Sequence, residues 1–198
     1  MSRDGSETRE KILSCTLDLL EAGDPARVRM SDIAKAAGVS RQAVYLHFPS
    51  RADLLIAATR LDDERRGVAE RLAASRNAET GRERLDAYTA CWADYLPEIH
   101  GLAKAFLAMV ETDEEAARAW NARMQDMREG CEAAVEALKK DGDLAPGLTV
   151  KTATDLYWML LSIRNWELLT RQCGWSRKDY KKHVMAAARR LLVRAAGD

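Results

Sequence analysis

The sequence predicts an all-α protein, in which a small helical module at the N-terminus is followed by a larger helical bundle. Apolar residues recur at intervals of three and four along nearly the whole chain, as amphipathic helices require, and no segment shows the two-residue alternation of a strand. The chain has 198 residues, of which 47% are hydrophobic. This composition is typical of a soluble globule with a sizeable core, and it disfavours disorder.

Two short helices are expected first. Ser6 or Thr8 is placed to cap the first helix, and Gly23 is placed to end it. The second helix is expected to begin near Met30 and to stop at Gly38.

A helix-turn-helix is predicted around the glycine at position 38. Ala34, Gly38 and Val44 stand at offsets of four and six. This spacing supplies a small residue where two helices cross, a glycine that tolerates a positive φ in the turn, and a branched residue that returns to the core. Ser40 can cap the second helix of the motif.

Longer helices are predicted after residue 50. Ser50 and Asp53 have the spacing of a capping box, and Pro49 keeps the preceding helix from running through. The expected helical segments are 51–74, 80–96, 98–110, 114–140, 149–172 and 176–195. We therefore expect a first domain at residues 1–50 and a second at residues 51–198, joined through a shared helix at about 51–74.

Charge is segregated along the chain although the net charge is zero. Five basic residues stand against one acidic residue, Asp32, between Pro25 and Arg51, and eight stand against Asp179 between Arg171 and Arg194. Either cluster could attract phosphate, although the C-terminal one is more simply a solvated helix face.

Targeting segments and bound metals are not expected. No apolar run reaches the roughly 18 residues of a membrane span, and the N-terminus lacks the apolar core of a signal peptide, so a cytoplasmic protein with no membrane partner is expected. The four cysteines are widely spaced and are expected to be reduced. His47, His100 and His183 have no metal-ligand spacing, and neither a cofactor motif nor a catalytic motif is present.

The second helix of the predicted motif carries side chains suited to DNA. On a helical wheel Val44 and Phe48 share one side, while Gln42 and Leu46 point away from it. Glutamine can pair with adenine, and an exposed leucine can meet a thymine methyl group, although Leu46 could equally cover a neighbouring helix. Arg41 and Tyr45 lie on the flank, where arginine suits guanine edges and the tyrosine hydroxyl suits a phosphate.

The stretch "MSDIAKAAGVSRQAVYLHFPSRADLL", residues 30–55, resembles the DNA-binding module of the TetR/AcrR family of transcriptional regulators. The matching residues are Ile33, Ala34, Ala37, Gly38, Val39, Ser40, Tyr45, His47, Phe48 and Arg51. The resemblance implies an entirely helical fold, with a three-helix DNA-binding module and a C-terminal bundle for ligand binding and dimerisation, and it implies a recognition helix at 41–48.

Two residues depart from the family pattern. Arg29 stands where a capping threonine is common, and Arg51 replaces the usual lysine; both are interpreted as phosphate contacts. The predicted DNA-binding residues are Arg29, Ser40, Arg41, Gln42, Ala43, Tyr45, Leu46, His47 and Arg51.

Aromatic residues and methionines are concentrated in the second domain. All five tryptophans lie after residue 90. Such residues are often simple core, but the resemblance implies an effector pocket in this bundle, and such pockets are mostly apolar. The predicted pocket residues are Tyr88, Trp92, Tyr95, Phe106, Met109, Trp120, Met124, Met127, Tyr157 and Arg164. Arg164 and Asn165 could instead lie at a dimer interface.

The resemblance implies a homodimer formed by 149–172 and 176–195 that binds a palindromic double-stranded DNA operator. A small apolar or aromatic effector would release it, as in a repressor. Two alternatives remain open: a DNA-binding regulator without small-molecule control, and an all-helical enzyme. The enzyme would need a convergent acid and base, for which Asp94, Glu111 and Glu167 are the candidates.

Overall fold

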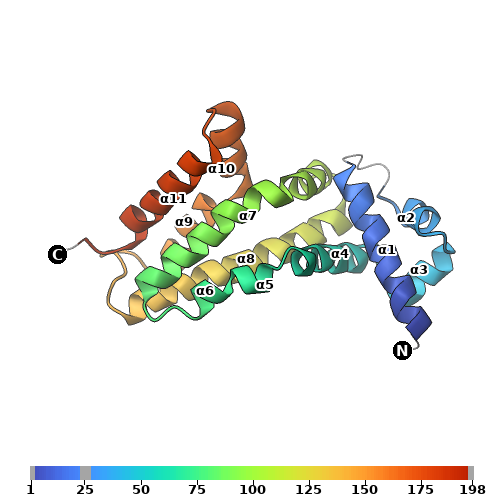
Figure 1. The fold of residues 1–198 in the computed structure, drawn as a ribbon, viewed down its shortest axis with the longest axis horizontal. Coiled ribbons are helices and arrows are strands. Elements are labelled where there is room, and N and C mark those ends of the chain that lie inside the picture. The colour runs from blue at the N-terminus through green and yellow to red at the C-terminus, as the bar shows by residue number, and fades with distance from the viewer. Residues whose placement is uncertain (1–2, 23–27, 196–198) are drawn as a thin grey trace. The chain divides into compact units, whose positions relative to one another are not determined.

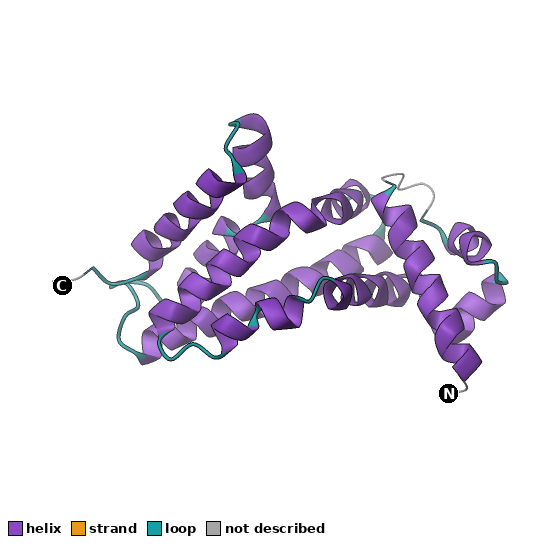
Figure 2. Cartoon of the chain, in the orientation of Figure 1, coloured by secondary structure: helices purple, strands orange, loops and turns teal. Residues whose placement is uncertain are grey.

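A computed structural model describes residues 3–22 and 28–195. Helices form the regular structure of these residues, as Figure 2 shows, and the described chain contains no strand beyond one isolated bridge between Leu144 and Val193. The all-α prediction is confirmed. The position of Gly23, expected to end the first helix, lies outside the described residues.

Figure 1 labels the helices in chain order. They are α1 (Arg3–Glu21), α2 (Met30–Ala37), α3 (Arg41–His47), α4 (Arg51–Arg65), α5 (Val68–Arg71), α6 (Ala73–Arg76), α7 (Gly81–Met109), α8 (Glu114–Lys140), α9 (Val150–Leu160), α10 (Ile163–Glu167), the π-helix η2 (Leu168–Gln172) and α11 (Arg177–Leu192). They fall into two compact units. The first unit contains Met1–Gly67 and His100–Met124, and the second contains Val68–Ile99 and Gln125–Asp198.

The first unit has a core built from α1 to α4 and from the parts of α7 and α8 that belong to it. Fully buried residues such as Ile12, Ile33, Val44 and Leu54 pack in one cluster with Phe106. Burying aliphatic and aromatic side chains of this size stabilises by about 1.5–3 kcal/mol each. The helix-turn-helix is therefore held by α7 and α8 residues that lie far from it in sequence.

The second unit packs α7 and α8 closely at two glycines. A Cβ on Gly81 would lie 2.5 Å from the backbone nitrogen of Leu138, and a Cβ on Gly130 would lie 2.2 Å from the Tyr88 hydroxyl. That hydroxyl donates a 2.8 Å hydrogen bond to the Met127 carbonyl. Only glycine fits at these two positions without displacing a neighbour.

Two predicted helix boundaries in the first unit were wrong, the start of α1 and the end of α4. α1 begins at Arg3, so Ser6 and Thr8 lie inside it and do not cap it. The expected helix 51–74 ends at Arg65, because Gly67 adopts a φ of 65° that terminates α4. α4 consequently lies entirely within the first unit.

The expected break at Pro97 is also absent. α7 runs through this proline as one helix of 29 residues. Proline removes one backbone hydrogen bond from a helix, but Leu96 and Ile99 beside it are buried, and their packing offsets the loss.

The expected single helix at 149–172 is divided into α9, α10 and η2. Ser162 adopts a ψ of 138°, and its side chain accepts a hydrogen bond from the Arg164 amide at 3.2 Å. A serine that bonds to nearby backbone competes with the helical ladder, which accounts for the break. The helices predicted at 114–140 and 176–195 are confirmed as α8 and α11.

Candidate nucleic-acid interface

The turn between α2 and α3 is set by one glycine. Gly38 has φ 64° and ψ 33°, in the left-handed region that other residues rarely adopt. Its amide donates to the Lys35 carbonyl at 3.1 Å, and the Val39 amide donates to Ala34 at 3.0 Å, which closes the end of α2. The Ser40 hydroxyl then accepts from the Ala43 amide at 3.1 Å and begins α3. The predicted helix-turn-helix is present.

α3 has one buried side and one exposed side. Val44 is fully buried, and Phe48, the residue after the helix, is 2% exposed. Leu46 is 82% exposed, and Arg41 and Gln42 are exposed as well. Leu46 therefore covers no neighbouring helix among the described residues, and its contact with a thymine methyl group stays a prediction.

Arg41 and Tyr45 are oriented by each other on the flank of α3. The guanidinium donates to the Tyr45 hydroxyl at 3.3 Å and lies 5.5 Å from the centre of its ring. With Arg29 and Ser31 they line part of a pocket of about 530 Å³. Arg29 is exposed and makes no side-chain cap on α2, so its charge stays available to an anion.

Arg51 does not fit the predicted phosphate contact. Its side chain turns inward and is only 9% exposed. The guanidinium donates to the Val28 carbonyl and to Asp113, each at 2.5 Å. Burial disfavours the charged form of Asp113, yet hydrogen bonds from the Ala116 amide and from Arg51 hold the pKa of this carboxyl below its usual range. The expectation is corrected: Arg51 forms an internal ion pair.

Two α8 residues that bind the start of α4 were not among the predicted site residues. The Glu115 carboxylate accepts hydrogen bonds from the amides of Arg51 and Ala52 at 3.1 and 3.3 Å. The Arg118 guanidinium donates to the Ser50 hydroxyl at 2.8 Å. Glu115 and Arg118 lie more than 60 positions from these partners in sequence, and no local pattern predicts such a contact.

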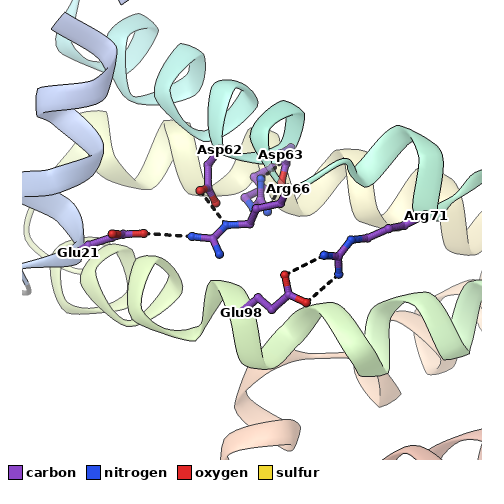
Figure 3. Close-up of polar contacts among 7 residues, drawn as sticks. Glu21, Asp62, Asp63, Arg66, Arg71 and Glu98 are labelled. Carbon is purple, nitrogen blue, oxygen red and sulfur yellow. Dashed lines mark hydrogen bonds and ion pairs between the residues drawn. The ribbon is translucent and has the colours of Figure 1, made fainter. Parts of the chain in front are cut away.

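The end of α4 is fixed by a second group of charged residues, shown in Figure 3. Arg66 donates to Asp62 at 2.8 Å and to Glu21 of α1 at 3.0 Å. The buried Arg123 of α8 donates two hydrogen bonds to Asp63. α4 is therefore held at both ends by ion pairs within the first unit.

The predicted pocket residues are divided between the two units. Phe106, Met109, Trp120 and Met124 belong to the first unit, where Phe106 stacks on Trp120 with ring centres 5.9 Å apart. Burial of Phe106 and Met109 in the core with the helix-turn-helix favours a packing role for them.

The other predicted pocket residues belong to the second unit. Tyr88 contacts Trp92 and Tyr157 with ring centres 6.1 and 6.0 Å apart, and Trp92 contacts Tyr95 at 5.7 Å. Met127 is buried with them, and its carbonyl accepts the hydrogen bond from Tyr88. These residues form an aromatic cluster, so the second unit brings together this subset of the predicted pocket residues.

Arg164 does not contribute a buried charge to the second unit. It is exposed on α10, and Asn165 donates a hydrogen bond to the Met159 carbonyl. Among the described residues of this unit, the buried polar side chains are Ser75, Thr89 and Thr154. The interior of the second unit is therefore uncharged over the described part of the chain.

Among residues 3–22 and 28–195, no cluster of histidine, cysteine and carboxylate side chains could hold a metal ion. Over the same residues, no helix has the length and hydropathy needed to cross a membrane.

Known proteins share both the first module and the fold. Residues 12–58 match the sequence profile of bacterial regulatory proteins of the tetR family. Over these residues the chain is similar to the tetR family. The HTH-type transcriptional regulator AcrR of Shigella flexneri is 35% identical over 68 residues, which are 34% of this chain and 32% of AcrR. The chain thus spans about a quarter to a third of the length of the curated relatives it matches.

Solved structures extend the likeness to the whole TetR-family fold. A structure described as a TetR-family transcriptional regulator from Rhodococcus sp. superposes with a TM-score of 0.73 at 20% identity, covering 94% of this chain and 99% of that one. A transcriptional regulator from Saccharomonospora viridis, in complex with choline, has a TM-score of 0.71 at 20% identity and covers 96% of this chain and all of its own. At this identity the likeness establishes the fold.

Proposed function

We propose that this protein is a TetR-family transcriptional regulator that binds double-stranded DNA through α3. The exposed face of α3 carries this proposal. Leu46, 82% exposed, has no protein neighbour to cover it and stands beside Gln42 and Arg41. An apolar group flanked by an amide and a guanidinium matches the thymine methyl and base-edge pattern of a major groove.

An enzyme is the competing class, and the candidate acids do not support it. Asp94 is exposed and pairs with Lys181 at 2.5 Å, while Glu111 is exposed on the turn before α8. General acid-base catalysis needs an acid and a base that converge on one substrate, whereas Asp94 and Glu111 are exposed carboxylates and Asp94 is already paired with Lys181. A regulator therefore fits the described residues better.

Selection of duplexes from a random DNA library tests DNA binding directly. Gln42→Ala should change the base preferred at one or two positions and cost about 1–3 kcal/mol on the preferred site only. Tyr45→Phe should weaken binding to all duplexes similarly, because a phosphate contact carries no sequence information. A uniform loss in Gln42→Ala, or no duplex bound by the wild type, would overturn the assignment.

The proposal includes a homodimer formed through α9, η2 and α11. These elements carry the exposed apolar residues Met159, Leu168 and Leu191. Lys181, by contrast, already pairs with Asp94 of the same chain. Leu191→Glu should give monomers in sedimentation, whereas Lys181→Ala with Lys182→Ala should not, because apolar burial and not charge holds the interface. Two half-sites about 34–36 Å apart would then be read together.

We also propose that a small uncharged molecule binds in the second unit and releases DNA, as in a repressor. The hydroxyls of Tyr180 and Thr154 are buried without a hydrogen-bond partner, and burial raises the pKa of Tyr180. An unpaired buried hydroxyl is costly, so a ligand with a polar oxygen beside an apolar body would be stabilised there. The choline bound by the S. viridis protein is a precedent for a small-molecule ligand in this fold.

The route of coupling differs from the expected one. The helix expected to be shared, α4, ends within the first unit, whereas α7 and α8 each have residues in both units. We propose that these two helices transmit the effect of the ligand. A compound that quenches tryptophan fluorescence should weaken DNA binding by a coupling of about 1–3 kcal/mol, and DNA should weaken binding of the compound equally. Compounds that bind without changing DNA affinity would leave the second unit as a dimerisation domain only.

A further inference from the structure

The Arg51 side chain uses its donors inside the protein. Its Nε donates to the Val28 carbonyl at 2.5 Å, Nη1 pairs with Asp113 at 2.5 Å, and Nη2 lies 3.7 Å from the Met109 sulfur. A DNA phosphate that took the place of Asp113 would leave that partly buried carboxylate without its cation. Breaking a buried ion pair in this way is strongly unfavourable. The exposed Arg29 and Arg41 form no such ion pair with the described residues.

The partners of Arg51 lie where three helices begin. Val28 stands two residues before α2, Arg51 is the first residue of α4, and Asp113 caps α8 by accepting from the Ala116 amide at 3.1 Å. Glu115 strengthens the same junction, because its carboxylate accepts from the amides of Arg51 and Ala52. α3 lies between α2 and α4 in sequence, so the direction of both flanking helices is set at this junction.

We propose that Arg51 is a positioning residue of the DNA interface, held by Asp113, and that the turn between α7 and α8 is thereby part of the DNA-reading structure. The proposal rests on the proposed DNA binding. It assigns Arg51 no contact with DNA: the side chain fixes the entry into α2 and α4, and α3 presents its exposed face accordingly. A position where the family usually places a lysine is used here for a three-way internal bridge, which the forked guanidinium makes from three separate nitrogens while a lysine has only one.

Salt dependence separates positioning from phosphate contact. Each phosphate neutralised by a side chain contributes about 0.9 to the slope of log affinity against log salt. Arg51→Met should lower affinity for a selected duplex by roughly tenfold at every salt concentration, leaving the slope of the wild type unchanged. Arg29→Met is the matched variant, because Arg29 is exposed and is interpreted as a phosphate contact, and it should reduce the slope by about one. A reduced slope in Arg51→Met would overturn the proposal.

In a second pair of variants, the sign of the change in DNA affinity distinguishes electrostatics from positioning. Asp113→Asn removes a negative charge near bound DNA, so electrostatics alone predicts tighter binding, whereas weakened positioning predicts looser binding. Glu111→Gln removes the same charge two residues away, on an exposed side chain. We expect Asp113→Asn to bind more weakly than the wild type and Glu111→Gln to bind as well or better. Equal tightening in both variants would contradict the proposal.

Arg51→Lys covers the case in which Arg51→Met fails to fold. A phosphate contact predicts that lysine retains wild-type affinity and slope, while positioning predicts weaker binding at an unchanged slope. Thermal unfolding monitors the folded state of each variant. If the wild type binds no duplex in a salt-dependent manner, the proposed function itself fails, whereas a wild type that binds and an Arg51 variant that loses slope would sink only this inference.

Discussion

The two units stabilise their interiors by different means. Among the described residues of the first unit, three charged side chains are buried, those of Arg51, Asp62 and Arg123, and each has an ion-pair partner. The described interior of the second unit contains no buried charge, and its polar groups are hydroxyls set among aromatic rings. Ion pairs require one geometry, while apolar surfaces tolerate rearrangement. The difference suits the proposed roles, a rigid DNA interface in the first unit and an interior that can accommodate a ligand in the second.

The largest expected effect compares two arginine–carboxylate pairs, Arg123 with Asp63 and Arg71 with Glu98, and Figure 3 shows the second of them. Arg123 is 7% exposed and donates twice to Asp63, so Asp63→Ala should cost about 3–5 kcal/mol of unfolding free energy. Arg71 donates twice to Glu98, at 2.8 and 2.9 Å, but both side chains are 36% exposed. Glu98→Ala should cost no more than about 1 kcal/mol, because water screens the pair.

Urea denaturation of both variants and the wild type measures this difference. Equal losses for Asp63→Ala and Glu98→Ala would show that the first unit does not depend on its charged pairs more than the second does.

A smaller effect is expected from two glycines within helices. Gly130→Ala should destabilise by about 1–3 kcal/mol, because the new Cβ would lie 2.2 Å from the Tyr88 hydroxyl in the second unit. Gly101→Ala in the first unit has no atom within 4 Å of the new Cβ and should stabilise by about 0.5–1 kcal/mol. Thermal unfolding of the two variants decides; a neutral Gly130→Ala would mean that the aromatic cluster yields more readily than its packing indicates.

The least perturbing test changes no residue. Burial raises the pKa of the Cys131 thiol to about 12, whereas Cys173 is exposed. A thiolate-selective reagent at pH 8 should therefore label Cys173 in the native protein and leave Cys131 unmodified until the second unit opens. Mass spectrometry of labelled peptides over time distinguishes the two sites. Rapid labelling of Cys131 would show that the interior of this unit is already open to solvent without a ligand.

Local patterns in the sequence predicted the local structure well. Gly38, Ser40 and Ser50 act through neighbours within five residues, and each is confirmed by a hydrogen bond at the predicted place. The Asp53 carboxylate, predicted to complete a capping box, accepts from the Ser50 hydroxyl. The same reasoning went wrong at Pro97, where packing from distant residues outweighs the preference of a single position.

The role of Arg51 could not be predicted from sequence for a related reason. The residues that turn its side chain inward, Asp113 and Met109, lie about 60 positions away. A basic residue in a matching family motif suggests a phosphate contact, and only the packing of the α7–α8 turn shows that the charge is already neutralised. Whether Arg29, Arg41, Gln42 and Tyr45 contact DNA stays a prediction, although the structure leaves Arg29, Arg41 and Gln42 exposed.

The central claim is that α1 to α4 and the parts of α7 and α8 that belong to the first unit form one cooperative structure that supports the proposed DNA interface. Native-state hydrogen exchange tests it most directly, because amides that open together share one free energy of opening. We predict that the amides of α8 up to Met124 share the free energy of opening of α4, and that the amides from Gln125 onward share that of α9 and α11. Asp63→Ala should accelerate hydrogen exchange only in the first group. Exchange of α8 as one uniform block, unaffected by Asp63→Ala or accelerated along its whole length, would contradict the claim.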